Sequence, residues 1–186
     1  MRQEFLKSLI VIACLFISIN ANAFDFEVDG IYYNIESETE LTVRVTFIDW
    51  SGNSYKGDVI IPETVSCFNK TFRVTTIGTG AFGACSELYS ITIPNSITTI
   101  TPNAFNNSPS LKQIIVEAGN PNYATKDGVL FNKGFTKLIA YPEAKASTYI
   151  IPDNVKTIEM YAFSFCKSLT SVIIPNSVNN YWLARF

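Results

Sequence analysis

The sequence predicts a β-rich α/β solenoid, in which short coils of chain stack along one axis. Three features recur in one register: an Ala-Phe pair, a leucine and a proline. The Ala-Phe pairs and the leucines are both spaced by 23 and then 58 residues, and 58 is one period of 23 with 35 residues added. A fixed period of this length is the signature of stacked repeats. The repeated residues are Ala81-Phe82, Ala104-Phe105 and Ala162-Phe163; Leu88, Leu111 and Leu169; and Pro62, Pro94, Pro152 and Pro175.

Each 23-residue unit is predicted to form one coil with a short strand. Ile91 and Ile93 alternate with polar residues, which is typical of a strand with one buried face. Pro94 follows at once and has no N–H to donate, so it ends the pairing of the strand. The Ala-Phe pair then begins a short helical turn. One unit cannot bury its own apolar side, whereas stacked units with parallel strands about 4.8 Å apart can.

Residues 1–23 are predicted to be a secretory signal peptide. Arg2 and Lys7 give a basic start, the apolar run "SLIVIACLFISI" follows, and "ANA" supplies small residues before cleavage at Ala23-Phe24. The run is shorter than the roughly 20 apolar residues of a transmembrane helix, so no transmembrane span is expected. The alternative is a lipoprotein anchor at Cys14, but the apolar run continues past this cysteine and we favour cleavage. The chain is therefore expected to be secreted or to lie at the cell surface.

Residues 24–57 are predicted to form an N-terminal β-hairpin cap. Alternating apolar residues in "IYYNI" and "LTVRVTF" indicate two antiparallel strands joined by a polar turn. This hairpin would shield the first coil, whose apolar end would otherwise face water. Asp25, Glu27 and Asp29 alternate on a preceding strand, and we favour a solvated strand face over a calcium site.

Residues 58–186 are predicted to be the solenoid, and "SCFNKTFRV" indicates a small hairpin with its tip at residues 69–70. A larger insertion at about residues 118–147 begins as a loop, "AGNPNY", and continues as a β-hairpin around "NKG". The last repeat is incomplete, because Arg185-Phe186 stands where Ala-Phe is expected. The final "NNYWLARF", residues 179–186, is either an apolar lid or the remnant of a longer array. We favour the remnant, which predicts end-to-end self-association. The five coil strands are expected near Val59, Ile91, Ile114, Tyr149 and Val172.

The repeats resemble those of the BspA-like leucine-rich repeat family of bacterial surface proteins. Units of that family carry "IPxSVTSIGxxAFxxCxxLxSI", which "VTTIGTGAFGACSELYSITIPNSITTI" and "VKTIEMYAFSFCKSLTSVIIPNSV" fit closely. "KDGVLFNKGFTKLIAYP" resembles the hairpin that interrupts some of its repeats, and "FEVDGIYYNI" resembles its usual start. The resemblance implies a curved leucine-rich repeat solenoid with one short parallel strand per coil, an extracellular binding role and no catalytic residues.

The composition disfavours several kinds of chemistry. The chain contains no histidine, which removes Ser-His and Cys-His nucleophile pairs and zinc sites built on histidine. A net charge of −2 without a basic cluster disfavours nucleic acid as a partner. No catalytic residue, cofactor site or metal site is predicted.

Cys85 and Cys166 are the pair that suggests a disulfide or a metal site. Both stand three residues after the phenylalanine of an Ala-Phe pair, and Ser108 holds the matching position between them. Three coil steps of about 4.8 Å separate the cysteines by about 14 Å, whereas a disulfide needs Cα atoms within about 7 Å. We therefore expect an inward position that suits a small, weakly polar side chain. Cys67 has no equivalent.

Two surfaces are candidates for binding a partner. In "DWSGNSYKG", Trp50 and Tyr55 flank a small polar loop, and they are either exposed for stacking on sugar or packed over the cap. The second surface is the exposed face of the coil strands, through which solenoids often bind. Its candidate residues are Thr92, Gln113, Ile115, Ser171 and Ile173.

The leading functional hypothesis is an exported, surface-associated protein that mediates adhesion. The resemblance to the BspA-like family implies that its partner is a host extracellular matrix or cell-surface protein, or the surface of another cell. The second hypothesis is a glycan-binding module that uses exposed aromatic residues. An enzyme is disfavoured.

Overall fold

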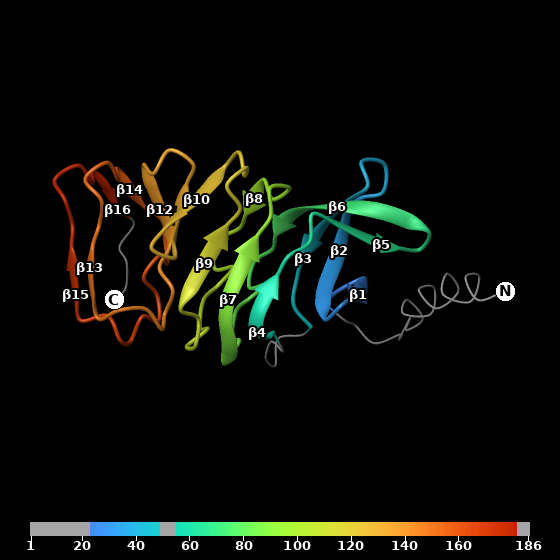
Figure 1. Cartoon of the computed structure of the whole chain (residues 1–186), viewed down its shortest axis with the longest axis horizontal. Coiled ribbons are helices and arrows are strands. Elements are labelled where there is room, and N and C mark those ends of the chain that lie inside the picture. Colours follow the sequence, from blue (N-terminus) through green and yellow to red (C-terminus); the bar gives the residue numbers. More distant parts are fainter. Residues whose placement is uncertain (1–22, 49–54, 182–186) are drawn as a thin grey trace.

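The computed structural model describes residues 23–48 and 55–181, and in these residues the chain consists of strands and turns. The strands follow one another along an elongated molecule, from β1 near one end to β15 at the other (Figure 1). Five strands run in parallel at the predicted positions. They are β4 (Lys56–Ile60), β7 (Glu87–Ile93), β9 (Gln113–Val116), β13 (Thr148–Ile150) and β15 (Ser171–Ile173).

The register of these strands confirms the repeat. Val59 pairs with Ile91, and Ile91 pairs with Ile114. Tyr149 pairs with Val172 in the same way. The central residues of the five coils therefore align, but in two sheets, β4-β7-β9 and β13-β15, and not in one.

A second layer of short strands lies on the other side of the coils, in two sets that also pair in parallel. One set joins β3 (Thr42–Val45), β6 (Lys70–Ile77) and β8 (Thr99–Ile100). The other joins β12 (Lys137–Ala140), β14 (Thr157–Ile158) and β16 (Asn180–Tyr181). The apolar side chains are buried between the two layers of strands.

The expected helical turn at the Ala-Phe pair is not formed, since residues 23–48 and 55–181 contain no helix. Each pair is flanked by two residues with a left-handed backbone. Gly80 (φ 67°), Asn103 (φ 63°) and Tyr161 (φ 67°) precede the three pairs, and Ala84 (φ 57°), Asn107 (φ 61°) and Phe165 (φ 60°) follow them. A right-handed helix cannot continue through such residues, so the coil closes as a turn. The described chain is thus an all-strand solenoid, and the α component of the α/β prediction is absent from it.

The N-terminal strands form the expected hairpins. β1 (Phe26–Val28) pairs antiparallel with β2 (Ile31–Ser37), which pairs antiparallel with β3. β5 (Thr64–Cys67) and β6 form the small hairpin around residues 68–69. The acidic residues before β2 contact backbone: Ile35 N–H donates to Asp25, and Gly30 N–H donates to Glu27. Because β3 runs parallel beside β6, the N-terminal hairpin continues a sheet of the solenoid.

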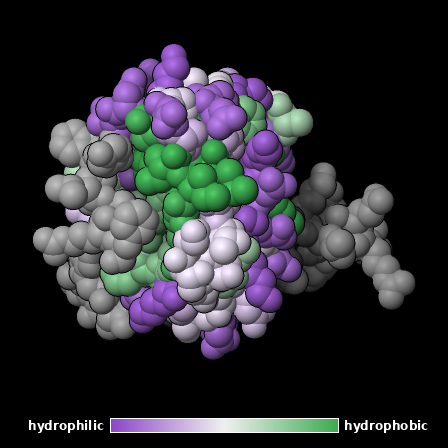
Figure 2. Space-filling model, turned by 90° about the vertical axis from the view of Figure 1, so that its left-hand side faces the viewer, coloured by the Kyte–Doolittle hydropathy of each residue, from purple (hydrophilic) through white to green (hydrophobic). Residues whose placement is uncertain are grey.

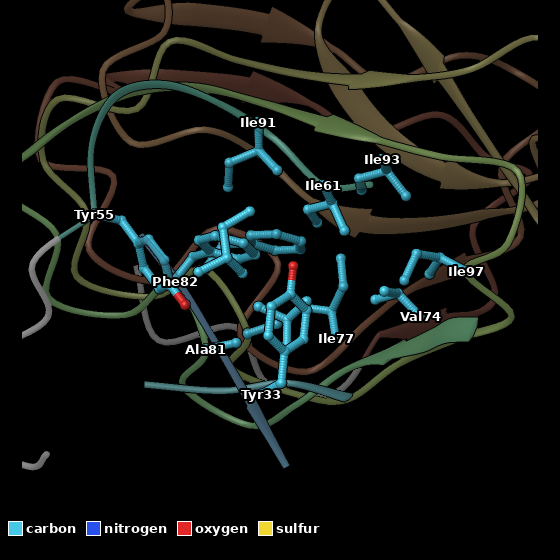
Figure 3. Close-up of a cluster of buried hydrophobic side chains, with 14 of the residues drawn as sticks. Tyr33, Tyr55, Ile61, Val74, Ile77, Ala81, Phe82, Ile91, Ile93 and Ile97 are labelled. Carbon is cyan, nitrogen blue, oxygen red and sulfur yellow. The ribbon is translucent and has the colours of Figure 1, made fainter. Parts of the chain in front are cut away.

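The first core cluster lies between these strands and the first coils (Figure 3). Tyr33, Ile77, Phe82 and Ile91 are fully buried there. Their side chains converge from β2, β6, the Ala-Phe turn and β7, so the cap and the repeats share one hydrophobic core.

The larger insertion contains one strand more than predicted. The hairpin of β11 (Val129–Asn132) and β12 is present, as expected from "NKG". The segment before it, expected as a loop up to Tyr123, continues into β10 (Tyr123–Lys126), which pairs antiparallel with β11. We call β10 and β11 the crossing hairpin, because it runs from one layer of strands to the other. At its base the Tyr123 hydroxyl accepts a hydrogen bond from Ile100 N–H of β8, and at its tip Gly128 O accepts one from Ile114 N–H of β9.

The crossing hairpin divides the core in two. Leu130 packs in the first cluster, while Val129 and Phe131 on the other face of β11 pack in the second. Gly128 at the tip lies against β9 so closely that a Cβ would meet the Gln113 Cβ at 2.9 Å, and its φ is +76°. Only glycine fits this approach without strain. The two parallel sheets are separate because this hairpin stands between them.

Candidate functional site

The aromatic loop predicted as a sugar site is not assembled from the described residues. Trp50 lies outside them. Tyr55 is 4% exposed, and its ring centroid lies 4.8 Å from that of Phe82. Its hydroxyl donates to Thr46 O at 2.8 Å and accepts from Tyr32 N–H at 3.1 Å. Tyr55 is therefore a core residue, which is the packing alternative that the sequence left open, and it is not available to a ligand.

The strand-face candidates fall into two groups. Thr92 and Ile115 occupy one row of the β4-β7-β9 sheet, where Ile60, Thr92 and Ile115 are in register. Gln113 lies in the neighbouring row beside Ser90. On the second sheet, Ile173 pairs with Ile150 and Ser171 pairs with Thr148. The structure thus brings together Thr92, Gln113 and Ile115 on one sheet, and Ser171 and Ile173 on the other.

Two residues of this face were missed by the sequence analysis, although they are the most exposed. Ile60 and Ile150 are each 68% exposed, compared with 39% for Ile115 and 57% for Ile173. All four occupy the position two residues before the proline of the repeat or its equivalent, so the register alone identifies them. Thr92 holds the same position in the one remaining coil, that of β7. We call the four isoleucines and Thr92 the isoleucine row.

Polar groups border the isoleucine row on β4 and β7. Ser90 donates a hydrogen bond to Asp58, and the Lys56 ammonium lies 3.2 Å from the Glu87 carboxylate. Lys112 also lies over the exposed ring of Tyr89, 5.9 Å from its centroid. An exposed apolar strip with a polar border is typical of protein interfaces.

A second apolar surface lies at the C-terminal end of the described chain (Figure 2). Ile174 is 44% exposed, whereas its counterparts Ile93 and Ile151 are fully buried. Leu169 and Val178 are only partly buried, although their counterparts in earlier coils are buried: Leu88 and Leu111 for the first, Ile97 and Val155 for the second. The inward side of the last described coil is therefore half open to its surroundings.

The cysteine positions are structural, as expected. Among the described residues, no disulfide joins any two of Cys67, Cys85 and Cys166. Cys85 and Ser108 are fully buried at equivalent inward positions, and Cys166 is partly buried at the third. Burial raises the pKa of the Cys85 thiol to about 11 and that of Cys166 to about 12. Both thiols are therefore protonated and weakly reactive at neutral pH.

Within residues 23–48 and 55–181, no three histidine, cysteine or acidic residues are grouped as a metal site. The same part of the chain has no helix with the length and apolarity required to span a membrane.

The fold and its repeats define a class of binding scaffold, the bacterial leucine-rich repeat proteins. The model of the BspA type leucine rich repeat region matches residues 59–127 and 139–182 in six copies, and the chain belongs to this family. The gap between the two matched segments, residues 128–138, holds β11, the turn that follows it and the first two residues of β12. Proteins of this family are typically secreted or surface proteins that bind other proteins, and the repeat is generally not enzymatic.

Solved structures show the same fold. A leucine-rich repeat protein from Eubacterium ventriosum is 37% identical over 58% of this chain and 29% of its own, with a TM-score of 0.56. One from Bacteroides ovatus is 25% identical over 87% of this chain and 44% of its own, with a TM-score of 0.54. A leucine rich cell surface protein from Faecalibacterium prausnitzii is 21% identical over 84% of this chain and 44% of its own, with a TM-score of 0.51, and it shows the fold alone. The chain thus spans less than half the length of these three proteins. None of the curated proteins compared with the chain matches it.

Proposed function

We propose that the chain is an exported adhesion protein that binds another protein through the isoleucine row. The observation that carries this proposal is the exposure of Ile60 and Ile150, each 68%, at matching positions of two parallel sheets. Isoleucine in an exposed strand position costs solubility and adds nothing to the core, so a face that keeps it in four of five coils is suited to burial against a partner. The partner we propose is a host extracellular matrix or cell-surface protein.

The chain's export is part of this proposal. Residues 1–22, which hold most of the proposed signal peptide, lie outside the described residues. We propose cleavage at Ala23-Phe24, residues 24–57 as the N-terminal cap and residues 58–186 as the repeat region. The mass of the exported protein tests cleavage directly. A chain that is acylated at Cys14 would be heavier than the cleaved chain by the lipid and by residues 14–23.

Surface plasmon resonance against immobilised matrix proteins tests the binding face. The variant Ile60→Ser with Ile150→Ser removes two exposed side chains, and Phe165→Asn is a matched control that removes an exposed aromatic residue outside the row. Burying a side chain of this size contributes about 1.5–3 kcal/mol, so we expect the double variant to bind at least about tenfold more weakly. The control should bind as the wild type does. Equal loss in both variants, or no loss in the double variant, would contradict binding through the row.

A further inference from the structure

The stacking of the coils is interrupted beside the crossing hairpin. In the regular part, Phe82 N–H donates to Ala104 O of the next coil at 2.8 Å, and their turns are in contact. Tyr141 N–H donates to Ala162 O at 2.8 Å in the same way, so Ala140-Tyr141 takes the place of an Ala-Phe pair. Among the described residues, no backbone hydrogen bond joins Ala104-Phe105 to Ala140-Tyr141. The hairpin separates these two coils at the strands and leaves their turns apart.

A cleft of about 540 Å³ opens between the separated turns. One wall is residues 98–106, and the other is formed by residues 137–143 and 159–164. Its apolar lining includes Phe105, Leu111 and Ile139. A volume of this size is in the range of sites that hold small ligands. We call this feature the inter-coil cleft.

Both hydrogen-bond donors and hydrogen-bond acceptors line the cleft. The Asn106 side-chain amide donates to the Asn103 side-chain oxygen at 2.7 Å, which leaves the nitrogen of Asn103 as a donor and the oxygen of Asn106 as an acceptor. Glu159 and Lys137 form an ion pair at 2.6 Å. This ammonium and this carboxylate offer further hydrogen-bond donors and acceptors, and their charges cancel. These groups suit a neutral ligand that both donates and accepts hydrogen bonds.

Glu143 holds the cleft in shape. Its carboxylate reaches from one coil to the other and accepts a hydrogen bond from Ser108 N–H at 3.0 Å. It is 7% exposed, and burial raises the pKa of its carboxyl group. Because its oxygen already serves the backbone of the opposite coil, we assign it a positioning role.

Tyr161, which lines the cleft, has a left-handed backbone conformation that is unfavourable for an aromatic residue. Its φ is 67°, whereas the same position of the earlier coils holds Gly80 (φ 67°) and Asn103 (φ 63°). Glycine and asparagine adopt this left-handed region readily, but a bulky aromatic residue there is strained. Tyr161 is also 43% exposed, so the core does not require its ring. The ring is thus an exposed aromatic surface beside the cleft, which a ligand can contact.

We propose that the inter-coil cleft binds one saccharide unit, with the Tyr161 ring on the apolar face of the sugar. The hydroxyl groups of a sugar donate and accept hydrogen bonds, which matches the mixed amide, ammonium and carboxylate groups of the lining. An aromatic ring beside such groups supplies the apolar contact that a pyranose ring also needs. This site shares no residue with the isoleucine row, so it goes beyond the proposed protein-binding function.

Saturation-transfer NMR on residues 24–186 tests the site with the methyl glycosides of glucose, galactose, mannose and N-acetylglucosamine. Tyr161→Asn removes the ring and places at this position the residue found at Asn103, so this variant should melt no lower than the wild type. Phe165→Asn is the matched control, because Phe165 is a similarly exposed aromatic residue with positive φ that lies outside the lining.

We expect at least one of the four glycosides to receive saturation from the wild type and from Phe165→Asn. Tyr161→Asn should bind that glycoside at least about tenfold more weakly. The proposal is overturned if none of the four receives saturation, or if Tyr161→Asn binds as the wild type does. It is also overturned if Tyr161→Asn instead weakens binding of a protein partner, which would make the cleft part of a protein interface. The two proposals fail separately: if the variant with Ile60→Ser and Ile150→Ser keeps its protein binding, the glycoside result still stands.

Discussion

Ser108→Ala should destabilise the fold more than any surface change, because Ser108 joins neighbouring coils through buried hydrogen bonds. Its hydroxyl donates to Phe82 O at 2.6 Å and accepts from Cys85 N–H at 3.2 Å, and the side chain is fully buried. Alanine would leave one buried carbonyl and one buried N–H without a partner, at about 1–3 kcal/mol each. We therefore expect a loss of about 2–6 kcal/mol in the free energy of unfolding. For a chain of this length that corresponds to a melting temperature lower by about 4–24 °C.

Urea unfolding followed by circular dichroism measures this change, and Ser108→Cys is the matched control. Cysteine already occupies the equivalent positions, where the Cys166 thiol donates to Tyr141 O at 3.6 Å and the Cys85 thiol to Gly83 O at 3.5 Å. A thiol is a weaker donor than a hydroxyl but fills the same space, so Ser108→Cys should lose roughly half as much as Ser108→Ala. If Ser108→Ala unfolds within about 0.5 kcal/mol of the wild type, the inter-coil hydrogen bonds do not hold the stack and the reasoning is refuted.

Three further predictions concern other parts of the molecule. Tyr33 is fully buried and its hydroxyl has no hydrogen-bond partner among the described residues, so Tyr33→Phe should be neutral or stabilising by about 1–2 kcal/mol in the same urea assay, and a clear loss would contradict this. Burial raises the folded-state pKa of Glu143, so its contribution to stability is present below the unfolded pKa and is lost as pH rises through the folded pKa. The melting temperature of the wild type relative to Glu143→Gln should therefore fall as pH rises from about 4 to about 7, and a constant difference would argue against a raised pKa. The half-open last coil predicts self-association that rises with concentration in analytical ultracentrifugation and is lost in Ile174→Lys, whereas a monomer at every concentration would indicate that this surface is covered within the chain.

Most of the fold could be predicted because the repeat restricts it. Once Ala-Phe and proline share a period, each coil must place its alternating residues on one parallel strand, and Val59, Ile91 and Ile114 align as expected. The helical turn was predicted wrongly, because the left-handed residues around Ala-Phe include Tyr161 and Phe165. These aromatic residues give no sign in the sequence of a positive φ, unlike glycine or asparagine.

The insertion shows where a local pattern loses its information. Asn120 stands 23 residues after Ile97, in a core position of the repeat, and is fully buried. Its amide donates to Pro94 O and Ile97 O and accepts from Asn122 N–H and Tyr123 N–H, so every polar group is satisfied. From sequence alone, "GNPNY" reads as a surface turn, and β10 was missed for that reason.

The candidate surfaces were predictable to different extents. The isoleucine row follows from register, and Ile60 could have been named with Ile115. The inter-coil cleft could not, because it depends on how far the crossing hairpin separates two coils, and no residue pattern encodes that distance. Tyr55 illustrates the opposite case, since an aromatic residue at the edge of a polar loop is equally compatible with exposure and with the core.

The crossing hairpin also sets how the molecule unfolds. In an uninterrupted solenoid each coil is stabilised by its neighbours, so the array melts as one cooperative body. Here the two hydrophobic clusters meet mainly at β11, where Leu130 belongs to one cluster and Val129 and Phe131 belong to the other. The two parts of the chain are also joined after β12, where Ala144 N–H donates to Leu111 O. The second block can therefore open while the first remains folded, and amide hydrogen exchange should divide the chain at this hairpin into a slow and a fast half. In the proposed adhesion role, the second block would lengthen under load before the first block unfolds.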